Sequence, residues 1–207
     1  MADGDYLRRA LAAADWFART QVLMKKPHWD ANFGRFVYTY HLPTRERVLG
    51  LSWTQGRAIV TLLAAYEATG NGESLRSAVR GAEYIKHLQI LDARSPRTFG
   101  AIREEVPASW YVYPRDAMEA GLGLLFLWRI TRDDDLLYRS RVFGDWLIAN
   151  TMRDGWPTGG FYLDEAEAAE HGYRHIACIG GGANFFLYLA KATGNDEYLE
   201  RVYKPMA

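Results

Sequence analysis

Three carboxyl groups stand where the chain could carry out acid–base chemistry. Asp116 lies at the predicted start of a helix, directly after Pro114 and Arg115. Glu104 and Glu105 follow a short extended run in the loop before that helix. Glycoside cleavage needs one carboxyl to protonate the leaving oxygen and a second to activate water or attack. We therefore predict Asp116 as the catalytic acid and Glu104 or Glu105 as its partner, since alternation points only one of the two inward.

A structural role is the alternative for each of these acids. Aspartate is among the best N-cap residues, so Asp116 could simply cap its helix. A pair of acids in a loop, such as Glu104 and Glu105, is commonly just solvated. Glu119 lies one turn after Asp116 on the same helix face and could act as its partner, or could pair with Arg115 instead.

The residues around these acids have the chemistry of a sugar-binding site. A guanidinium group matches a carboxylate bidentately, so Arg57 and Arg115 could hold an acidic sugar or neutralise a neighbouring acid. Aromatic residues make up 14% of the chain, and sugar rings stack on such side chains, although core packing is the alternative for each of them. The predicted substrate-binding residues are Trp53, Gln55, Arg57, Trp110, Tyr113, Arg115, Glu119, Trp156, His171 and His175.

A partial set of metal ligands precedes the last predicted inner helix. His171, His175 and Cys178 form a His-x3-His-x2-Cys pattern, and these ligand types suit zinc. A structural zinc site usually has four protein ligands, and only three are present here. We therefore predict no metal and no cofactor, and expect one histidine to bind substrate or to shuttle a proton.

A repeat of 62 residues positions these side chains. Thr69-Gly70-Asn71 returns as Thr193-Gly194-Asn195, and Thr131-Arg132-Asp133 lies midway. Each unit reads as a helical hairpin: a helix apolar on all sides, which must be buried, then a turn, then an amphipathic surface helix. We expect inner helices over residues 54–68, 116–130 and 178–192, and outer helices over 6–21, 74–91, 135–150 and 197–207.

The connections between hairpins are long, about 30 residues each, and long loops in a compact domain are usually functional. Each contains a glycine followed by a short extended run, at residues 34–38, 100–104 and 160–164. We expect these runs to form short β-hairpin-like loops at the end where the inner helices begin. The free N–H groups of those helix starts suit anionic ligands.

The pattern resembles the six-hairpin glycosidase superfamily. The resemblance is carried by Ala-Tyr-Glu-Ala-Thr-Gly-Asn at residues 65–71, followed by an outer helix of the Tyr-Leu-x-x-Ala type. Trp-Thr-Gln-Gly-Arg at residues 53–57 and Arg-Asp-Ala-Met at 115–118 are similar to segments of the unsaturated glucuronyl and rhamnogalacturonyl hydrolases. The resemblance implies an all-α (α/α) toroid in which Asp116 is the acid/base.

The number of hairpins corresponds to about half of a six-hairpin ring. One outer helix and three inner–outer pairs would leave apolar faces of the end helices uncovered. We therefore predict a single toroid domain over residues 1–207 that is incomplete. A homo-oligomer or a missing C-terminal half would complete the ring.

Composition excludes several classes of protein. The chain has 25 Lys and Arg against 25 Asp and Glu, and such a balance argues against nucleic-acid and membrane partners. A single cysteine excludes a disulfide framework, and the polar N-terminus, which no apolar run follows, predicts a cytoplasmic protein.

We predict a glycoside hydrolase acting on uronate-containing oligosaccharides. The alternatives are a sugar epimerase or a polysaccharide lyase on the same scaffold, or a non-catalytic helical repeat that binds a peptide. The long acidic and aromatic loops argue against a helical repeat without catalytic activity.

Overall fold

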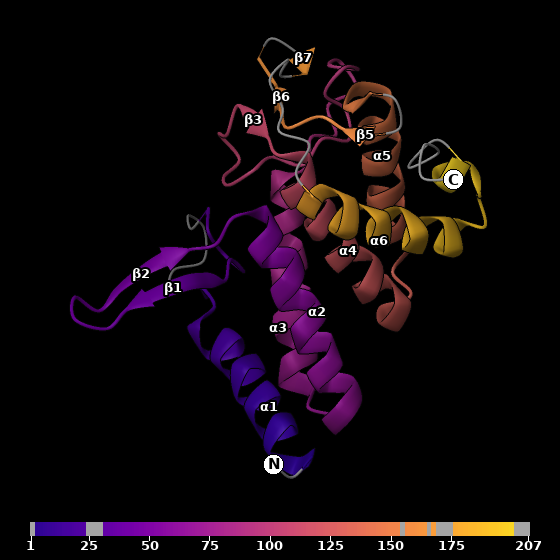
Figure 1. The fold of residues 1–207 in the computed structure, drawn as a ribbon. Coiled ribbons are helices and arrows are strands. Elements are labelled where there is room, and N and C mark those ends of the chain that lie inside the picture. Colours follow the sequence, from indigo (N-terminus) through magenta and orange to yellow (C-terminus); the bar gives the residue numbers. More distant parts are fainter. Residues whose placement is uncertain (1–2, 24–30, 154–155, 165–166, 169–175, 201–207) are drawn as a thin grey trace.

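The computed structural model describes residues 3–23, 31–153, 156–164, 167–168 and 176–200. Within these ranges the chain forms two rows of helices, with most of the short strands at one end and one hairpin projecting from the side (Figure 1). The inner row consists of α2 (Ser52–Thr69), α4 (Pro114–Thr131) and α6 (Ile176–Thr193). The outer row consists of α1 (Asp3–Thr20), α3 (Gly72–Leu88), α5 (Asp134–Asn150) and the short α7 (Glu197–Glu200).

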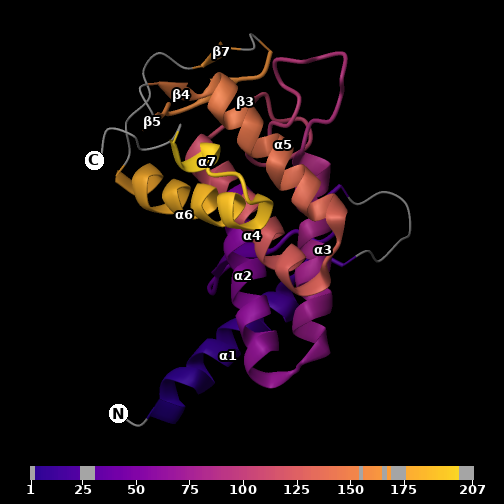
Figure 2. The ribbon, with the colours of Figure 1, turned by 90° about the vertical axis from the view of Figure 1, so that its right-hand side faces the viewer.

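The helices pack as the 62-residue repeat predicts. Each inner helix contacts the outer helix that follows it, and α4 lies between α2 and α6 in the inner row. The inner helices begin at the end of the molecule that carries the loops, while α1 and the N-terminus lie at the opposite end (Figures 1 and 2). Of the outer helix expected over residues 197–207, only α7 falls within the described residues.

The turn between inner and outer helix has the same hydrogen bonds in all three hairpins. In the first, the Thr69 hydroxyl donates to the Ala65 carbonyl, and the side chain of Asn71 accepts from the Glu73 N–H. Thr131 with Asp133, and Thr193 with Asn195, repeat this arrangement. The residue between them is left-handed each time, with φ of 71° at Gly70, 59° at Arg132 and 68° at Gly194.

Helices α2 and α4 approach closely because glycines face each other between them. A Cβ atom added to Gly56 would overlap the backbone carbonyl of Glu119, and one added to Gly123 would lie 2.9 Å from the Gly56 Cα. This close contact fixes the first turns of the two helices against each other. It therefore fixes the distance between the residues that those turns carry.

Most of the strands lie at the loop end of the molecule, as expected, and one hairpin projects from its side (Figure 1). β1 (Val37–His41) and β2 (Glu46–Leu49) form an antiparallel hairpin, and β4 (Met152–Arg153) pairs with β5 (Trp156–Pro157). β3 (Tyr111–Val112), β6 (Phe161–Tyr162) and β7 (Glu167–Ala168) form a three-stranded sheet. The extended run expected at 100–104 makes only one isolated bridge, between Ile102 and Gln89.

The core runs along the inner row. Its largest fully buried side chains include Leu62 and Leu63 on α2 and Phe185 and Phe186 on α6. Helix α4 is buried on almost every side, which confirms the prediction from its uniformly apolar sequence. None of the described helices is long and apolar enough to span a bilayer.

Candidate functional site

Glu104 and Asp116 meet at the start of α4. Asp116 occupies the third position of the helix and is buried, and its carboxyl is hydrogen-bonded to that of Glu104. Glu104 comes from the loop before β3, where its N–H donates to the Tyr111 carbonyl at 3.2 Å and its carbonyl accepts from the Ser52 N–H at 2.8 Å. The loop thereby joins the first residue of α2 to the strand that leads into α4.

The surroundings of Glu104 favour its protonated form. Arg115 donates to Asp116 Oδ1 at 2.6 Å and so stabilises a negative charge on that carboxyl. Burial, followed by the adjacent negative charge and hydrogen bond of Asp116, raises the pKa of Glu104 to about 9. A protonated Glu104 can donate to Asp116 at neutral pH, or donate its proton to a substrate oxygen.

The helix starts around this pair differ from those of the outer helices. Asn71 and Asp133 cap α3 and α5 with their side chains, whereas the N-cap residues of α2 and α4, Leu51 and Tyr113, form no side-chain cap. The Tyr113 N–H donates to Glu104 Oε2 instead, at 3.3 Å. Asp116 is therefore not the N-cap of α4, and the capping role considered from the sequence is excluded.

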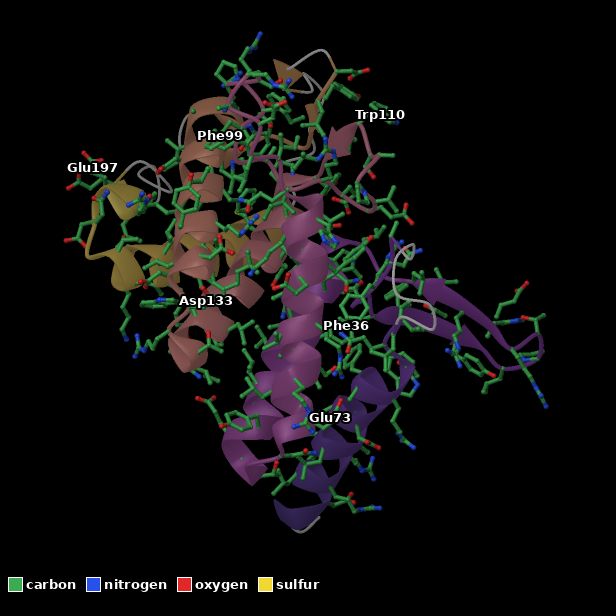
Figure 3. All side chains as sticks on the ribbon, turned by 180° about the vertical axis from the view of Figure 1, so that it is seen from behind. Phe36, Glu73, Phe99, Trp110, Asp133 and Glu197 are labelled. Atoms are coloured by element: carbon green, nitrogen blue, oxygen red, sulfur yellow. The ribbon has the colours of Figure 1, made fainter. Side chains whose placement is uncertain are left out.

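Aromatic side chains surround the mouth of the site. The rings of Trp110 and Tyr162 stack with centroids 5.5 Å apart and planes 8° from parallel, because β3 and β6 pair in a register that places Tyr111 opposite Tyr162. Trp110 is 59% exposed and lies at the loop end, away from Glu73 (Figure 3). These residues line a depression of about 400 Å³, formed by Glu104, Glu105, Ser109, Trp110, Tyr111 and Tyr162. That volume is within the range of small-ligand sites.

Two more of the predicted residues adjoin the carboxyl pair. The Arg115 guanidinium lies over the ring of Trp53, 5.6 Å from its centroid, and Trp53 also packs edge-on against Tyr38. The ring of Tyr113 lies 6.1 Å from that of Tyr111. Trp53, Tyr113 and Arg115 therefore lie beside the Glu104–Asp116 pair, as predicted.

The carboxylate of Glu105 pairs with Arg35 and not with Asp116. Its carboxylate accepts from the buried Arg35 guanidinium at 2.9 Å, and its carbonyl accepts from the Tyr84 hydroxyl. A buried arginine needs such a partner, because an unpaired charge in the interior is costly. Of the two loop acids, the structure thus brings Glu104 to Asp116 and uses Glu105 elsewhere.

Glu119 is buried and pairs with Arg57 of α2 at 2.5 Å, not with Arg115. The two residues are 62 positions apart and so hold equivalent places on neighbouring inner helices. Glu67 and Arg129 form a second pair of this kind, at 2.6 Å. Arg57 is mostly exposed, so part of its guanidinium is open to a ligand.

Gln55 does not have the geometry of a substrate-binding residue. Its amide nitrogen donates to the carbonyls of Gly50 and Leu51, and its oxygen accepts from the Phe36 N–H. The side chain is fully buried and holds the loop after β2 against α2. The sequence prediction for Gln55 is corrected on this ground, because both amide donors already bond to the backbone.

Three further predictions cannot be placed. His171 and His175 lie outside the described residues, as does the side chain of Trp156, whose backbone belongs to β5. No group of His, Cys, Asp and Glu in the described part of the chain could hold a metal ion.

The sequence interpretation missed Tyr162 and Arg35. Tyr162 belongs to one of the glycine-led extended runs, so its proximity to Trp110 could have been inferred from strand pairing. Arg35 is 70 residues from its partner Glu105, and nothing in the local sequence indicates that pair.

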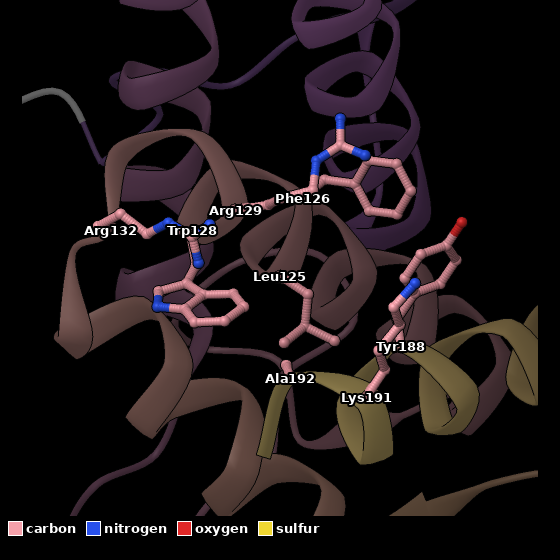
Figure 4. Close-up of a pocket in the computed structure, with 8 residues that line it drawn as sticks. All are labelled: Leu125, Phe126, Trp128, Arg129, Arg132, Tyr188, Lys191 and Ala192. Carbon is pink, nitrogen blue, oxygen red and sulfur yellow. The ribbon is translucent and has the colours of Figure 1, made fainter. Parts of the chain in front are cut away.

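A second cavity, of about 350 Å³, lies at the opposite ends of α4 and α6 (Figure 4). It is lined by Leu125, Phe126, Trp128, Arg129, Arg132, Tyr188, Lys191 and Ala192. Arg129 and Lys191 lie in the last turns of their helices, where a cation complements the helix dipole. No acid is among the residues that line this cavity, whereas the candidate acid–base pair lies at the helix starts.

Comparisons with known proteins bear on the fold. No protein-family model matches the sequence, and no curated protein matches it either. Among solved structures, a sugar epimerase from a ruminal bacterium superposes with a TM-score of 0.74 and 17% identity over 96% of this chain and 52% of its own. A D-mannose isomerase gives 0.67 and 16% over 95% and 48%. The cellobiose 2-epimerase of Spirochaeta thermophila DSM 6192 gives 0.66 and 14% over 95% and 52%.

These similarities settle the fold but not the expected subfamily. The three structures are named as epimerases and an isomerase, so the resemblance to glucuronyl hydrolases is confirmed only as a shared toroid. The chain spans about half the length of the structures it matches. With its inner and outer rows of repeated hairpins, it has the fold of about half of an (α/α) toroid.

Proposed function

We propose that this chain carries the acid–base site of a carbohydrate-active enzyme that epimerises or isomerises a sugar. The observation that carries the proposal is the hydrogen-bonded pair of Glu104 and Asp116, with the proton on Glu104 and stacked aromatic rings beside it. Moving a hydrogen next to a sugar carbonyl requires an acid at the carbonyl oxygen and a base at the neighbouring carbon. Glu104, with its raised pKa, suits the first role, and the carboxyl of Asp116 lies beside it for the second.

The spacing of the pair argues against hydrolysis by these two residues. The carboxyls of a glycosidase lie roughly 5 to 9.5 Å apart, since water or the sugar must fit between them. Two carboxyls that hydrogen-bond directly leave no such space. The names of the structurally similar proteins also support epimerisation or isomerisation over hydrolysis.

A glycoside hydrolase is the second candidate because of Glu119. This buried acid lies three residues after Asp116 on α4, and side chains so spaced have Cβ atoms roughly 5 to 6 Å apart. A hydrolase would use Asp116 with Glu119, whose carboxylate pairs with Arg57. Glu104 would then only position Asp116.

One assay separates these functions. The chain is incubated in D2O with a panel of reducing monosaccharides and disaccharides, and the products are analysed by mass spectrometry and NMR. An epimerase or isomerase gives a product of unchanged elemental composition apart from the deuterium, which an epimerase places on the carbon next to the carbonyl and an isomerase on the former carbonyl carbon. A hydrolase adds the elements of water, and a lyase gives an unsaturated sugar that absorbs in the ultraviolet.

Variants of the pair test the roles of its members. We expect Glu104→Gln and Asp116→Asn each to lower turnover by about 100-fold or more, the usual contribution of a general acid or base. Glu73→Gln is the matched control, because it makes the same change on the outer helix α3, away from the site, and should stay near wild type (Figure 3). Turnover that survives in both pair variants, or water addition as the only reaction, would contradict the proposal.

A further inference from the structure

Two outer helices hold the loop that carries the candidate acid. Tyr84 of α3 and Trp146 of α5 are 62 residues apart and so occupy the same position of the repeat. The Tyr84 hydroxyl donates to the Glu105 carbonyl. The Trp146 indole N–H donates to the Arg97 carbonyl at 2.9 Å. Residues 97–105, here called the acid loop, are therefore bonded at both ends to aromatic side chains of the outer row.

The middle of the acid loop also packs on the outer row. Gly100 has a left-handed φ of 102°, and a Cβ atom there would lie 2.5 Å from the Val142 carbonyl oxygen of α5. The side-chain amide of Gln89, the C-cap of α3, donates to the Gly100 carbonyl at 3.2 Å and to the Arg139 carbonyl at 2.9 Å. These contacts fix the middle of the loop against α5, so the end that carries the acid depends on other bonds.

At that end, helix α3 bonds the residue on each side of Glu104. The Arg103 N–H donates to the Leu88 carbonyl at 3.0 Å, and the Glu105 carbonyl accepts from Tyr84. The first bond joins two backbone groups, so Tyr84 supplies the bond that a side-chain substitution can remove. Between these two bonds, Glu104 places its carboxyl beside its partner on α4.

The Tyr84 side chain holds Glu105 together with Arg35. Tyr84 is fully buried, and a buried phenol hydroxyl needs a hydrogen-bond partner. Its partner is the backbone carbonyl of Glu105. The Arg35 guanidinium lies over the Tyr84 ring, 5.6 Å from its centroid, and donates to the Glu105 carboxylate at 2.9 Å. Glu105 is therefore fixed through its backbone and through its side chain.

We infer that Tyr84 is a positioning residue for Glu104, which it acts on through the carbonyl of Glu105. Because Tyr84 is fully buried, its effect on the reaction comes from where it holds the acid loop and not from contact with a substrate. A displacement of about 1 Å at a reacting group can lower a rate by about 100-fold. The inference rests on the proposed function, in which Glu104 is the acid.

Tyr84→Phe tests the inference, because it removes only the hydroxyl and keeps the buried ring. In the D2O assay described above, we expect kcat to fall by about tenfold while KM stays within about twofold. Tyr198→Phe is the matched control. Tyr198 is also buried and its hydroxyl donates to Asp145 at 2.7 Å, but it lies on α7 and has no bond to the acid loop. Both kinetic constants of this variant should stay near wild type.

The pKa of Glu104 reports its position without the reaction. It can be measured by carbon-13 NMR of the glutamate carboxyls, with the Glu104→Gln variant to assign the signal. The charged and titratable groups that face or adjoin Glu104 are Asp116 and Arg115 on α4, Tyr111 on β3 and, in the loop itself, Arg103 and Glu105 with its partner Arg35. Tyr84→Phe changes none of these groups. A loosened loop lets Glu104 move away from Asp116 toward water, so its pKa should fall by about one unit or more.

Tyr198→Phe should leave the pKa of Glu104 unchanged. An unchanged pKa in Tyr84→Phe would overturn the inference, whatever the turnover. Equal losses of kcat in Tyr84→Phe and Tyr198→Phe would overturn it as well, because they would reflect a general loss of stability. A Glu104→Gln variant that keeps full turnover would contradict the proposed function instead, and the NMR titration would still decide whether Tyr84 positions Glu104.

Discussion

At the scale of single residues, the site depends on an acid that stays protonated. Burial and the Asp116 carboxylate raise the pKa of Glu104 from an ordinary value of 4.5 to about 9. Arg115 donates to Asp116 at 2.6 Å, whereas Glu104 has no arginine of its own among its hydrogen-bonding partners in the described chain, so the two acids lie in different surroundings although they are neighbours. This separation of roles comes from their surroundings, because both side chains carry the same functional group.

The raised pKa predicts how stability changes with pH. Between about pH 4.5 and 9 the unfolded chain has lost the Glu104 proton while the folded chain keeps it, so the free energy of unfolding falls as pH rises. The limiting slope is about 1.4 kcal/mol per pH unit. Glu104→Gln cannot ionise, so this slope should be absent. Relative to wild type, the variant should gain stability steadily as pH rises through this range.

Urea unfolding at about pH 5, 7 and 9 measures this slope for each protein. Glu105→Gln is the control. It removes the partner of Arg35 but leaves Glu104 unchanged, so its stability should keep the pH dependence of wild type. Parallel curves for wild type and Glu104→Gln would show that Glu104 is ionised at neutral pH.

At the scale of elements, the sequence predicted every helix to within a few residues at the ends that are described. It did so because the repeat superimposes three copies of one hairpin, and because inner and outer helices differ in how many of their faces are apolar. The partners of side chains were less predictable. Glu104 and Asp116 were both proposed, but their direct hydrogen bond depends on the loop that ties Ser52 to Tyr111.

A usable signal was present for the pair of Arg57 and Glu119. Opposite charges separated by the repeat length occupy equivalent places on adjacent inner helices, and Glu67 with Arg129 follows the same rule. No such rule applies to Gln55, whose partners are backbone groups of a loop. Gln55 is buried because the loop after β2 packs against the start of α2, and neither composition nor periodicity predicts that packing.

The repeated turn predicts a stability difference at one helix end. Arg132 is left-handed with φ of 59°, where the other two hairpins have glycine. A non-glycine residue there costs about 1 kcal/mol. Arg132→Gly should therefore be more stable than Arg132→Ala by about that amount, since both variants lose the stacking of Arg132 on Trp128 and only one relieves the backbone.

Chemical denaturation of the two variants measures this difference. Gly70→Ala is the complementary change, and should destabilise the first hairpin by about 1 kcal/mol for the same reason. Equal stabilities for Arg132→Gly and Arg132→Ala would mean that the chain accepts alanine there without strain.

At the scale of the whole molecule, packing is uneven along the chain. Helix α4 is enclosed by α2, α3, α5 and α6, whereas the described helices that α1 mainly contacts are α2 and α3, and Tyr6 and Leu7 are exposed at its free end. Local opening costs least where few apolar contacts are lost. The molecule should therefore open from α1 inward, and the carboxyl pair on α4 should be the last part to lose its structure.

Native-state amide hydrogen exchange tests this order. We expect α1 to exchange fastest and α4 slowest, with opening free energies that differ by several kcal/mol, roughly the span between fraying and global unfolding. Helix α3 is the matched control, because it is an outer helix of similar length with neighbours on both sides, and it should exchange more slowly than α1 by about tenfold or more. Protection of α1 equal to that of α4 would mean that the chain unfolds as one cooperative unit. In that case α4 and the carboxyl pair on it would lose their structure together with α1.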